Sequence, residues 1–269
     1  MTLTPAEALV LLEPDTELGR EAAKVTFLGL LAQGVLRLEK ETGRLMGGTT
    51  RLRLARQPAE SPPHVAVVLD AVRYSRSGTI PDVVKRLAKA THRFAGFIPT
   101  LVRPRLIQRG LLMQRSHQEQ RRALLFFKRT VTVHTYHPTE AGAREQARLR
   151  GMLDTAPEIR AALDSNPARA AVMAAALGTL LVLVPALLPF LGQIGNAMAA
   201  APASGLGDSG GAEDMSWSDT DWTALDDAAS EFGDSLDGAL SDAESGSDGD
   251  GDGGSDSGGD SGGSDGGGE

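Results

Sequence analysis

The stretches LLAQGVL (residues 30–36) and LIQRGLL (residues 106–112) repeat one pattern within this 269-residue chain and decide its fold. In each stretch an apolar helical pattern stops at a glycine, Gly34 or Gly110, and a strand-like pattern follows. A glycine at this position supports the left-handed turn that ends many helices. Polar turns at KETGRLMGG (residues 40–48) and SHQEQRR (residues 116–122) then separate two strands in each copy. The sequence therefore predicts one unit twice: a helix, a glycine and a β-hairpin.

This order of elements is that of a winged helix, in which the glycine ends the third helix and the strands flank the wing. We predict a mainly α fold with short β-hairpins and two winged-helix-like repeats. The first repeat covers residues 1–57, and the second, with a closing helix, covers residues 64–165. The alternative is that two helix-to-strand turns are similar by chance.

A hydrophobic segment, residues 168–201, follows the repeats and carries no charge after Arg169. It exceeds the roughly 20 apolar residues that span a bilayer. Pro185 would cost about 3 kcal/mol inside a water-soluble helix, whereas bilayer helices tolerate such breaks. Two interpretations stay open: one kinked transmembrane helix, or a hairpin that is buried in the fold or lies peripherally on a membrane. For a span, Arg160 and Arg169 in front of it place the body in the cytoplasm.

Charge divides the chain into a basic body and an acidic tail. All 27 Lys and Arg residues lie at or before Arg169, and 19 of the 35 acidic residues lie after Gly207. Residues 208–269 are rich in Gly, Ser and Asp, bury too little apolar surface to fold, and are predicted to be disordered. One island in this tail, residues 216–236, spaces its hydrophobic side chains as a helix does. We predict that the island binds a basic partner, another protein or the chain's own body, through Trp217, Trp222, Leu225 and Phe232.

The strongest binding signal is a basic stretch between Val83 and Pro138, which holds 12 Lys or Arg residues and one acid, Glu119. Such an imbalance favours an anionic partner: acidic phospholipid, nucleic acid or the acidic tail. Pro99 and Pro104 interrupt the helix of the second repeat, which suits phosphate contacts better than base reading. We predict that an anionic phospholipid membrane is bound by Arg86, Lys89, Arg93, Arg103, Arg105 and Arg109.

Enzymatic motifs lack their context. GDSGG occurs twice, at residues 207–211 and 259–263, but both copies lie in the low-complexity tail. His134 and His137, three apart on a strand, point to opposite faces and do not form a metal site. The chain has no cysteine, which excludes disulfides and cysteine-based zinc sites. We therefore expect no enzyme, no cofactor and no metal, and the acidic N-terminus, MTLTPAEALVLLEPD, predicts that the protein is not secreted.

The body resembles the Golgi phosphoprotein 3 family, which has bacterial members, from about Leu3 to Leu191. The resemblance rests on LTPAEALVLLEPDTELG, FLGLLAQGVLRLE, VVLDAVR, LIQRGLLMQR, LLFFKRT and NPARAAVMAAAL. It implies a mostly helical fold that binds phosphatidylinositol 4-phosphate on a basic face, with Arg103, Arg105 and Arg109 nearest to the headgroup. The body lacks the tryptophan of the family's site, and its tail is foreign to the family. The tail instead resembles that of poorly characterised bacterial membrane proteins with Gly-rich C-termini.

These observations lead to one functional hypothesis and one alternative. The hypothesis is a non-enzymatic protein on the cytoplasmic face of a membrane, held by a single span or peripherally, whose basic face engages anionic phospholipid headgroups. In it the acidic tail modulates that face or recruits partners. The alternative is a winged-helix regulator that binds nucleic acid, either free or tethered to a membrane.

Overall fold

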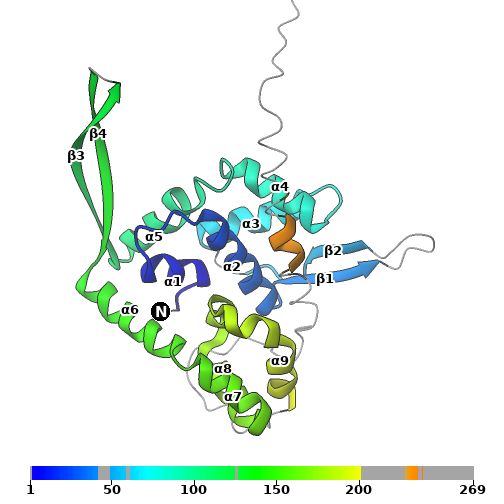
Figure 1. Ribbon diagram of the computed structural model, residues 1–269. Helices are drawn as coiled ribbons and strands as arrows, with labels where there is room; N and C mark the ends of the chain where they lie inside the picture. Colours follow the sequence, from blue (N-terminus) through cyan, green and yellow to red (C-terminus); the bar gives the residue numbers. More distant parts are fainter. Residues whose placement is uncertain are drawn as a thin grey trace, which may run out of the picture.

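The computed structural model describes residues 2–41, 49–58, 61–124, 127–200, 228, 230–235 and 238. These residues form a mainly helical body with two antiparallel β-hairpins (Figure 1). The predicted mainly α fold with hairpins is confirmed at this level. The described elements of the body are α1 (Pro5–Leu12), α2 (Gly19–Ala32), β1 (Leu36–Glu41), β2 (Thr49–Leu54), α3 (Pro63–Arg73), α4 (Ile80–Ala90), η1 (Phe97–Val102), α5 (Arg103–Gln108), β3 (Leu112–Leu124), β4 (Phe127–Pro138), α6 (Glu140–Leu153), α7 (Ala156–Ser165), α8 (Pro167–Leu177), η2 (Gly178–Leu183), η3 (Pro185–Phe190) and α9 (Leu191–Ala200).

Helix α2 lies at the centre of the body. Eleven of its fourteen residues are buried, and from Val25 to Ala32 they are buried on every side of the helix, whereas Arg20 and Glu21 in its first turn are exposed. It packs against α1, α3, η1 and η2. A helical segment that is apolar all round must be covered all round. The part of α2 from Val25 to Ala32 therefore requires neighbours on each face.

The two predicted glycine turns have the same geometry. Gly34 and Gly110 adopt left-handed backbone angles, with φ of 65° and 69°. The next residue in each copy, Val35 or Leu111, donates its N–H back into the preceding helix, at 3.0 and 2.9 Å. The carbonyl of the same residue then accepts an N–H from the residue that follows the hairpin, at 2.9 and 3.0 Å. The residue after each glycine is thus hydrogen-bonded both to the helix before the hairpin and to the residue that follows the hairpin.

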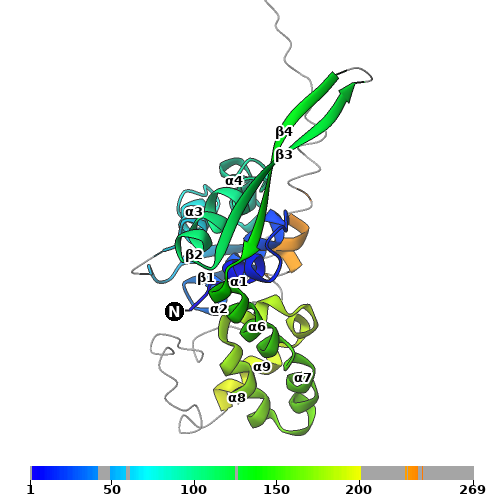
Figure 2. The same ribbon diagram turned by 90° about the vertical axis from the view of Figure 1, so that its left-hand side faces the viewer.

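The two hairpins differ in length and in surroundings. Strands β1 and β2 pair from Leu36 opposite Leu54, beside α2 and α3. Strands β3 and β4 pair from Leu112 opposite Pro138 out to Leu124 opposite Phe127, and the ribbon projects away from the helices (Figures 1 and 2). The predicted turn at residues 116–122 is wrong, because these residues continue β3. Both faces of a projecting ribbon are exposed to solvent, so its strand residues can be polar on both sides. A run of polar residues in such a strand has the same composition as a turn.

The hydrophobic segment folds as a hairpin of short helices. Helix α8 ends at Gly178, which has a φ of 58°, and η2 and η3 turn the chain so that α9 packs against α8. Leu181 and Leu187 are buried, and η2 contacts α1 and α2. Among the described residues, no helix is both long enough and apolar enough to cross a membrane. Of the two interpretations of the sequence, the described residues adopt the buried hairpin.

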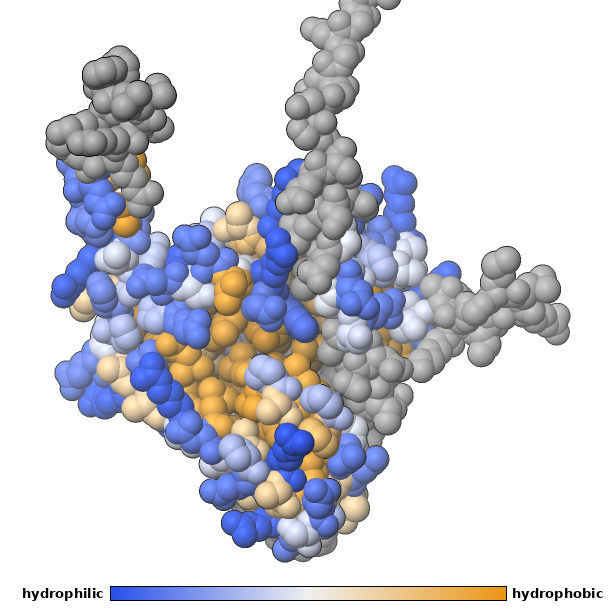
Figure 3. Space-filling model, in the orientation of Figure 1, coloured by the Kyte–Doolittle hydropathy of each residue, from blue (hydrophilic) through white to orange (hydrophobic). Residues whose placement is uncertain are grey.

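One contiguous hydrophobic cluster links these parts. Its buried side chains come from residues 1–57, 64–165 and 168–201, which were predicted as separate units, and from Ala228 and Phe232 of the tail. Figure 3 shows apolar surface where α1 lies above α8, with hydrophilic surface around it. The disorder predicted for residues 208–269 concerns positions that mostly lie outside the described residues.

Candidate anion-binding face

Helix α4 is amphipathic, with its cations on one side and its large apolar side chains on the other. Thr79 precedes it in an extended conformation and Pro81 lies in its first turn, as is common where helices begin. One side of the helix is buried in the core through Ile80, Val83, Val84 and Leu87. The opposite side is exposed and carries Lys85, Arg86 and Lys89. The helix therefore presents a row of three cations to solvent.

A tight turn fixes the start of α4. The Asp82 carboxylate accepts hydrogen bonds from the Ser75 hydroxyl at 2.8 Å, the Ser77 N–H at 3.0 Å and the Ser77 hydroxyl at 3.1 Å. The Ser77 N–H, and after it the Ser75 hydroxyl, hold the pKa of this carboxyl below its ordinary value. Asp82 is thus committed to the turn, and Arg76 lies within the loop that these bonds organise.

Strand β2 brings further arginines to this loop. The Leu52 N–H donates to the Gly78 carbonyl at 2.7 Å, and Arg51 forms a β-bridge with Thr79. Beside this junction lies a groove of about 360 Å³. Four of the residues that line it are arginines, from β2, the end of α3 and the loop: Arg51, Arg53, Arg73 and Arg76. Arg53 and Arg73 also pair with exposed acids, Glu39 at 3.4 Å and Asp70 at 3.9 Å.

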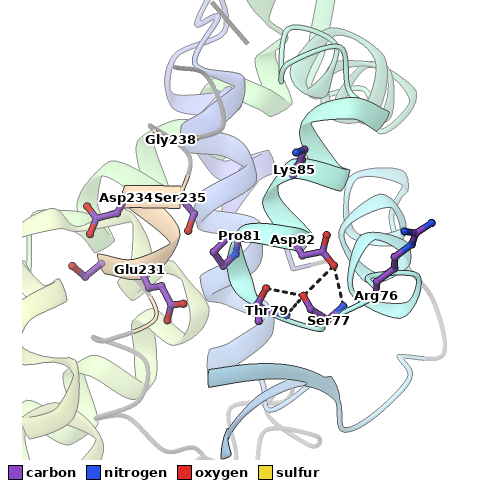
Figure 4. A pocket seen from close by; sticks show the side chains of 11 residues that line it. Arg76, Ser77, Thr79, Pro81, Asp82, Lys85, Glu231, Asp234, Ser235 and Gly238 are labelled. Atoms are coloured by element: carbon purple, nitrogen blue, oxygen red, sulfur yellow. Dashed lines mark hydrogen bonds between the residues drawn. The ribbon is translucent and has the colours of Figure 1, made fainter. Parts of the chain in front are cut away.

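A second, open groove of about 950 Å³ lies on the other side of the loop and shares Arg76 and Ser77 with the first. Lys85 lines it from α4, whereas Glu231 and Asp234 line it from the tail (Figure 4). We call the seven cations of the two grooves and of α4 the basic face: Arg51, Arg53, Arg73, Arg76, Lys85, Arg86 and Lys89.

Three of the six predicted lipid-binding residues are exposed on or near this face. Arg86 and Lys89 belong to α4, and the Arg86 guanidinium lies 5.6 Å from the centre of the Tyr74 ring. Arg93 is exposed in the turn after α4, where His92, Arg93 and Phe94 all have positive φ. Non-glycine residues adopt this conformation only when the surroundings hold them there. Burial of Phe94 supplies that hold and leaves Arg93 on the surface.

The other three predicted residues have partners inside the fold. Arg103 is only 8% exposed and donates to the carbonyls of Pro14, at 3.0 Å, and Thr16, at 2.7 Å. Arg105 and Arg109 both pair with the buried Glu7 carboxylate, at 2.8 and 3.0 Å. The six predicted residues therefore do not lie on one surface. The basic face does not include Arg103, Arg105 or Arg109.

A buried histidine adjoins the Glu7 pairs. The His64 Nε2 atom lies 2.9 Å from the Thr4 hydroxyl. Burial lowers the pKa of His64 from 6.5 to about 4, and the cation of Arg105 acts in the same direction. The ring is therefore neutral at physiological pH. This cluster connects the start of α1 to α3 and α5, and its Glu7 and His64 side chains are buried.

The predicted tail site is described only at Phe232, because Trp217, Trp222 and Leu225 lie outside the described residues. Phe232 is fully buried, and its ring stacks on Phe27 of α2, with centres 4.2 Å apart and planes 16° apart. Sequence reasoning missed Phe27. The signal that could have found it is that α2 is apolar on the face that carries Phe27 as well as on the face of Val25 and Leu28.

Sequence reasoning also missed the four arginines of the smaller groove, because β2 and the end of α3 lie outside the basic stretch between Val83 and Pro138. Among the described residues, no group of three potential metal ligands occurs. Comparison of the chain with protein-family models, with curated proteins and with solved structures found no match.

Proposed function

We propose that this chain is a non-enzymatic binding protein that engages anionic phospholipid headgroups at a membrane through its basic face. One observation carries the proposal: four arginines line a single groove, and that groove shares Arg76 with the larger groove that Lys85 of α4 lines. Guanidinium groups bind phosphate in a two-pronged geometry that lysine does not match. A groove with several arginines suits a phosphorylated headgroup, as the family resemblance implies for phosphatidylinositol 4-phosphate.

A membrane surface also suits the spread of the charge. Each basic residue close to an anionic bilayer contributes roughly 1 kcal/mol. From the end of β3 to the start of β4 the sequence is RRALLFFKR (residues 121–129), in which apolar residues stand between cations. Peripheral proteins commonly combine apolar insertion with cationic attraction in this way. The proposed location is the cytoplasmic face of a membrane.

Nucleic-acid binding is less well supported by the same geometry. We propose that the two helix–glycine–hairpin units are winged-helix-like repeats. A reader of DNA bases would place the helix before each hairpin in the major groove. Those helices are α2, which is buried on all sides from Val25 to Ala32, and α5, which has six residues and whose Arg105 pairs with Glu7. Neither helix therefore presents an extended polar face next to its hairpin.

Vesicle binding tests the proposal. The full chain is mixed with vesicles of phosphatidylcholine alone, with added phosphatidylserine, or with added phosphatidylinositol 4-phosphate, and the bound fraction is measured by sedimentation. We expect binding only to the anionic vesicles, and weaker binding at high salt because salt screens exposed charges. A duplex DNA in the same salt series tests the alternative.

The matched variants have equal changes in charge. Lys85→Ala, Arg86→Ala and Lys89→Ala together should weaken binding to anionic vesicles about 100-fold, because three contributions of about 1 kcal/mol are lost. The control removes three exposed arginines of α6 and α8: Arg144, Arg150 and Arg169. Equal weakening by both triple variants would show attraction by net charge alone and would refute the basic face as the site.

A further inference from the structure

The tail contributes a helical turn to the core of the body. Within residues 228–235, the described positions are helical, and Ala228 and Phe232 are buried in the same cluster as the helices of the body. Figure 1 shows this turn beside α4 and the base of the β1–β2 hairpin. The tail is otherwise acidic and poor in apolar residues, so a buried phenylalanine there marks a specific contact.

The contact falls on α2. The stacked rings of Phe27 and Phe232 give the turn an aromatic anchor, worth about 0.5–1.5 kcal/mol beyond the buried area. One turn of α2 earlier, the Lys24 ammonium lies 3.7 Å from the place where a Cβ on Gly233 would stand. The tail backbone at Gly233 thus lies close to this cation. The segment covers the part of α2 that carries Lys24 and Phe27.

The same turn forms one wall of the larger groove. Glu231 and Asp234 line that groove from the tail, and Arg76 and Lys85 line it from the body (Figure 4). The docked segment therefore brings two carboxylates to the edge of the basic face. Carboxylates near cations offset the positive potential that attracts an anionic ligand.

We propose that residues 228–235 are an intramolecular ligand of the body, anchored by Phe232 on Phe27, and that this docked segment competes with anionic ligands for the basic face. The docking is supported by the ring contact and by the burial of Phe232. The competition rests on the proposed function. Because segment and site belong to one chain, the effective concentration of the segment is high even where the contact is small.

Hydrogen exchange of the full chain tests the docking without any ligand. Phe232→Ala should expose the amides of residues 228–235 and speed the exchange of amides near Lys24 and Phe27 about tenfold. The amides of α7 to α9 should be unchanged, which shows that the variant is folded. Ser230→Ala, at an exposed position on the same turn, is the control and should match the wild type. Unchanged exchange of α2 in Phe232→Ala would overturn the docking.

Cross-linking tests that the ligand is intramolecular. The chain has no cysteine, so Lys24→Cys combined with Gly233→Cys introduces a single pair of thiols. A short thiol cross-linker should join them within one chain, at the mass of the monomer. The control pairs Gly233→Cys with Arg144→Cys on α6, which should not react as a pair. Cross-linked dimers in place of monomers would overturn docking within one chain.

Vesicle binding then tests the competition. Phe232→Ala and the charge variant Glu231→Gln with Asp234→Asn should each bind anionic vesicles about tenfold more tightly than the wild type, and Ser230→Ala should not. Confirmed docking with unchanged affinity in both variants overturns the competition. If no protein, the wild type included, binds anionic vesicles, the proposed function fails and the competition with it, while the exchange result still decides the docking.

Discussion

Arg109 lies 3.0 Å from Glu7, measured from Nη1 to Oε2, although the two residues are 102 positions apart. The Glu7 carboxylate is almost fully buried, and it also accepts the Thr4 N–H at 2.9 Å and pairs with Arg105. One carboxylate thus caps α1 and neutralises two cations of the second helix–glycine–hairpin unit. This relationship joins the two units of the chain.

Glu7→Gln should lower the free energy of unfolding by about 3 kcal/mol, because it leaves two guanidinium groups beside a neutral side chain in a buried site. Urea denaturation followed by circular dichroism measures the change. The control is Glu140→Gln, whose pair with Arg144 is exposed and should be worth less than about 0.5 kcal/mol. Equal losses in the two variants would contradict the central role of Glu7.

His64 should make stability depend on pH. Its pKa is about 4 in the fold against 6.5 for an ordinary histidine, so below pH 6.5 the unfolded chain takes up a proton that the folded chain excludes. The contribution of His64 to the free energy of unfolding is fully present above pH 6.5, and about 3 kcal/mol of it is lost as the pH drops to 4. Urea midpoints between pH 7 and pH 4 measure this. His64→Gln should lose this part of the dependence, and the exposed His137→Gln should retain it.

Two glycines of α6 should respond in opposite directions to alanine. A Cβ at Gly142 would lie 1.9 Å from the Leu111 carbonyl oxygen, whereas a Cβ at Gly151 would meet nothing within 4 Å. Gly142→Ala should therefore destabilise the fold by about 2–3 kcal/mol through overpacking. Gly151→Ala should stabilise it by about 0.5 kcal/mol, because alanine loses less backbone entropy in a helix. Thermal melts of both variants measure the difference, and the same sign for both would contradict the close packing of α6 on Leu111.

Substitution of Arg103 should affect mainly stability, whereas substitution of Arg86 should affect mainly vesicle binding. Arg103→Ala removes charged hydrogen bonds to two carbonyl oxygens and the contact with the Tyr136 ring at 4.2 Å, so it should destabilise the fold by about 2 kcal/mol. Arg86→Ala should change stability by less than about 0.5 kcal/mol but weaken vesicle binding about fivefold. Melting temperatures and sedimentation of both variants measure the two effects, and the reverse assignment would refute the division between internal and exposed arginines.

The fold could be predicted from the sequence where local rules decide it. Gly34 and Gly110 have the left-handed angles that a helix stop requires, and Thr4 and Glu7 form a capping box, which a threonine three residues before a glutamate indicates. The amphipathic pattern of α4 likewise separates its buried side chains from Lys85, Arg86 and Lys89. These features depend on neighbours within a few residues, which the sequence displays directly.

Features that depend on distant partners could not be predicted. Nothing near Arg103 in the sequence shows that the carbonyls of Pro14 and Thr16 would receive its guanidinium, so it was indistinguishable from an exposed cation. The length of the β3–β4 ribbon was hidden because polar side chains suit both an exposed strand and a turn. The arginines of β2 joined the candidate site only through the junction of β2 with Gly78.

The stacked pair on α2 also has a consequence for the order of synthesis. Phe27 and Phe232 are about 200 residues apart. Translation adds about 5–20 residues per second, so Phe27 leaves the ribosome roughly 10–40 seconds before its partner exists. During that interval the central helix carries an uncovered aromatic ring. The core of this protein is therefore complete only after the acidic tail that carries Phe232 has been synthesised, although the charge of that tail alone would predict exposure to solvent.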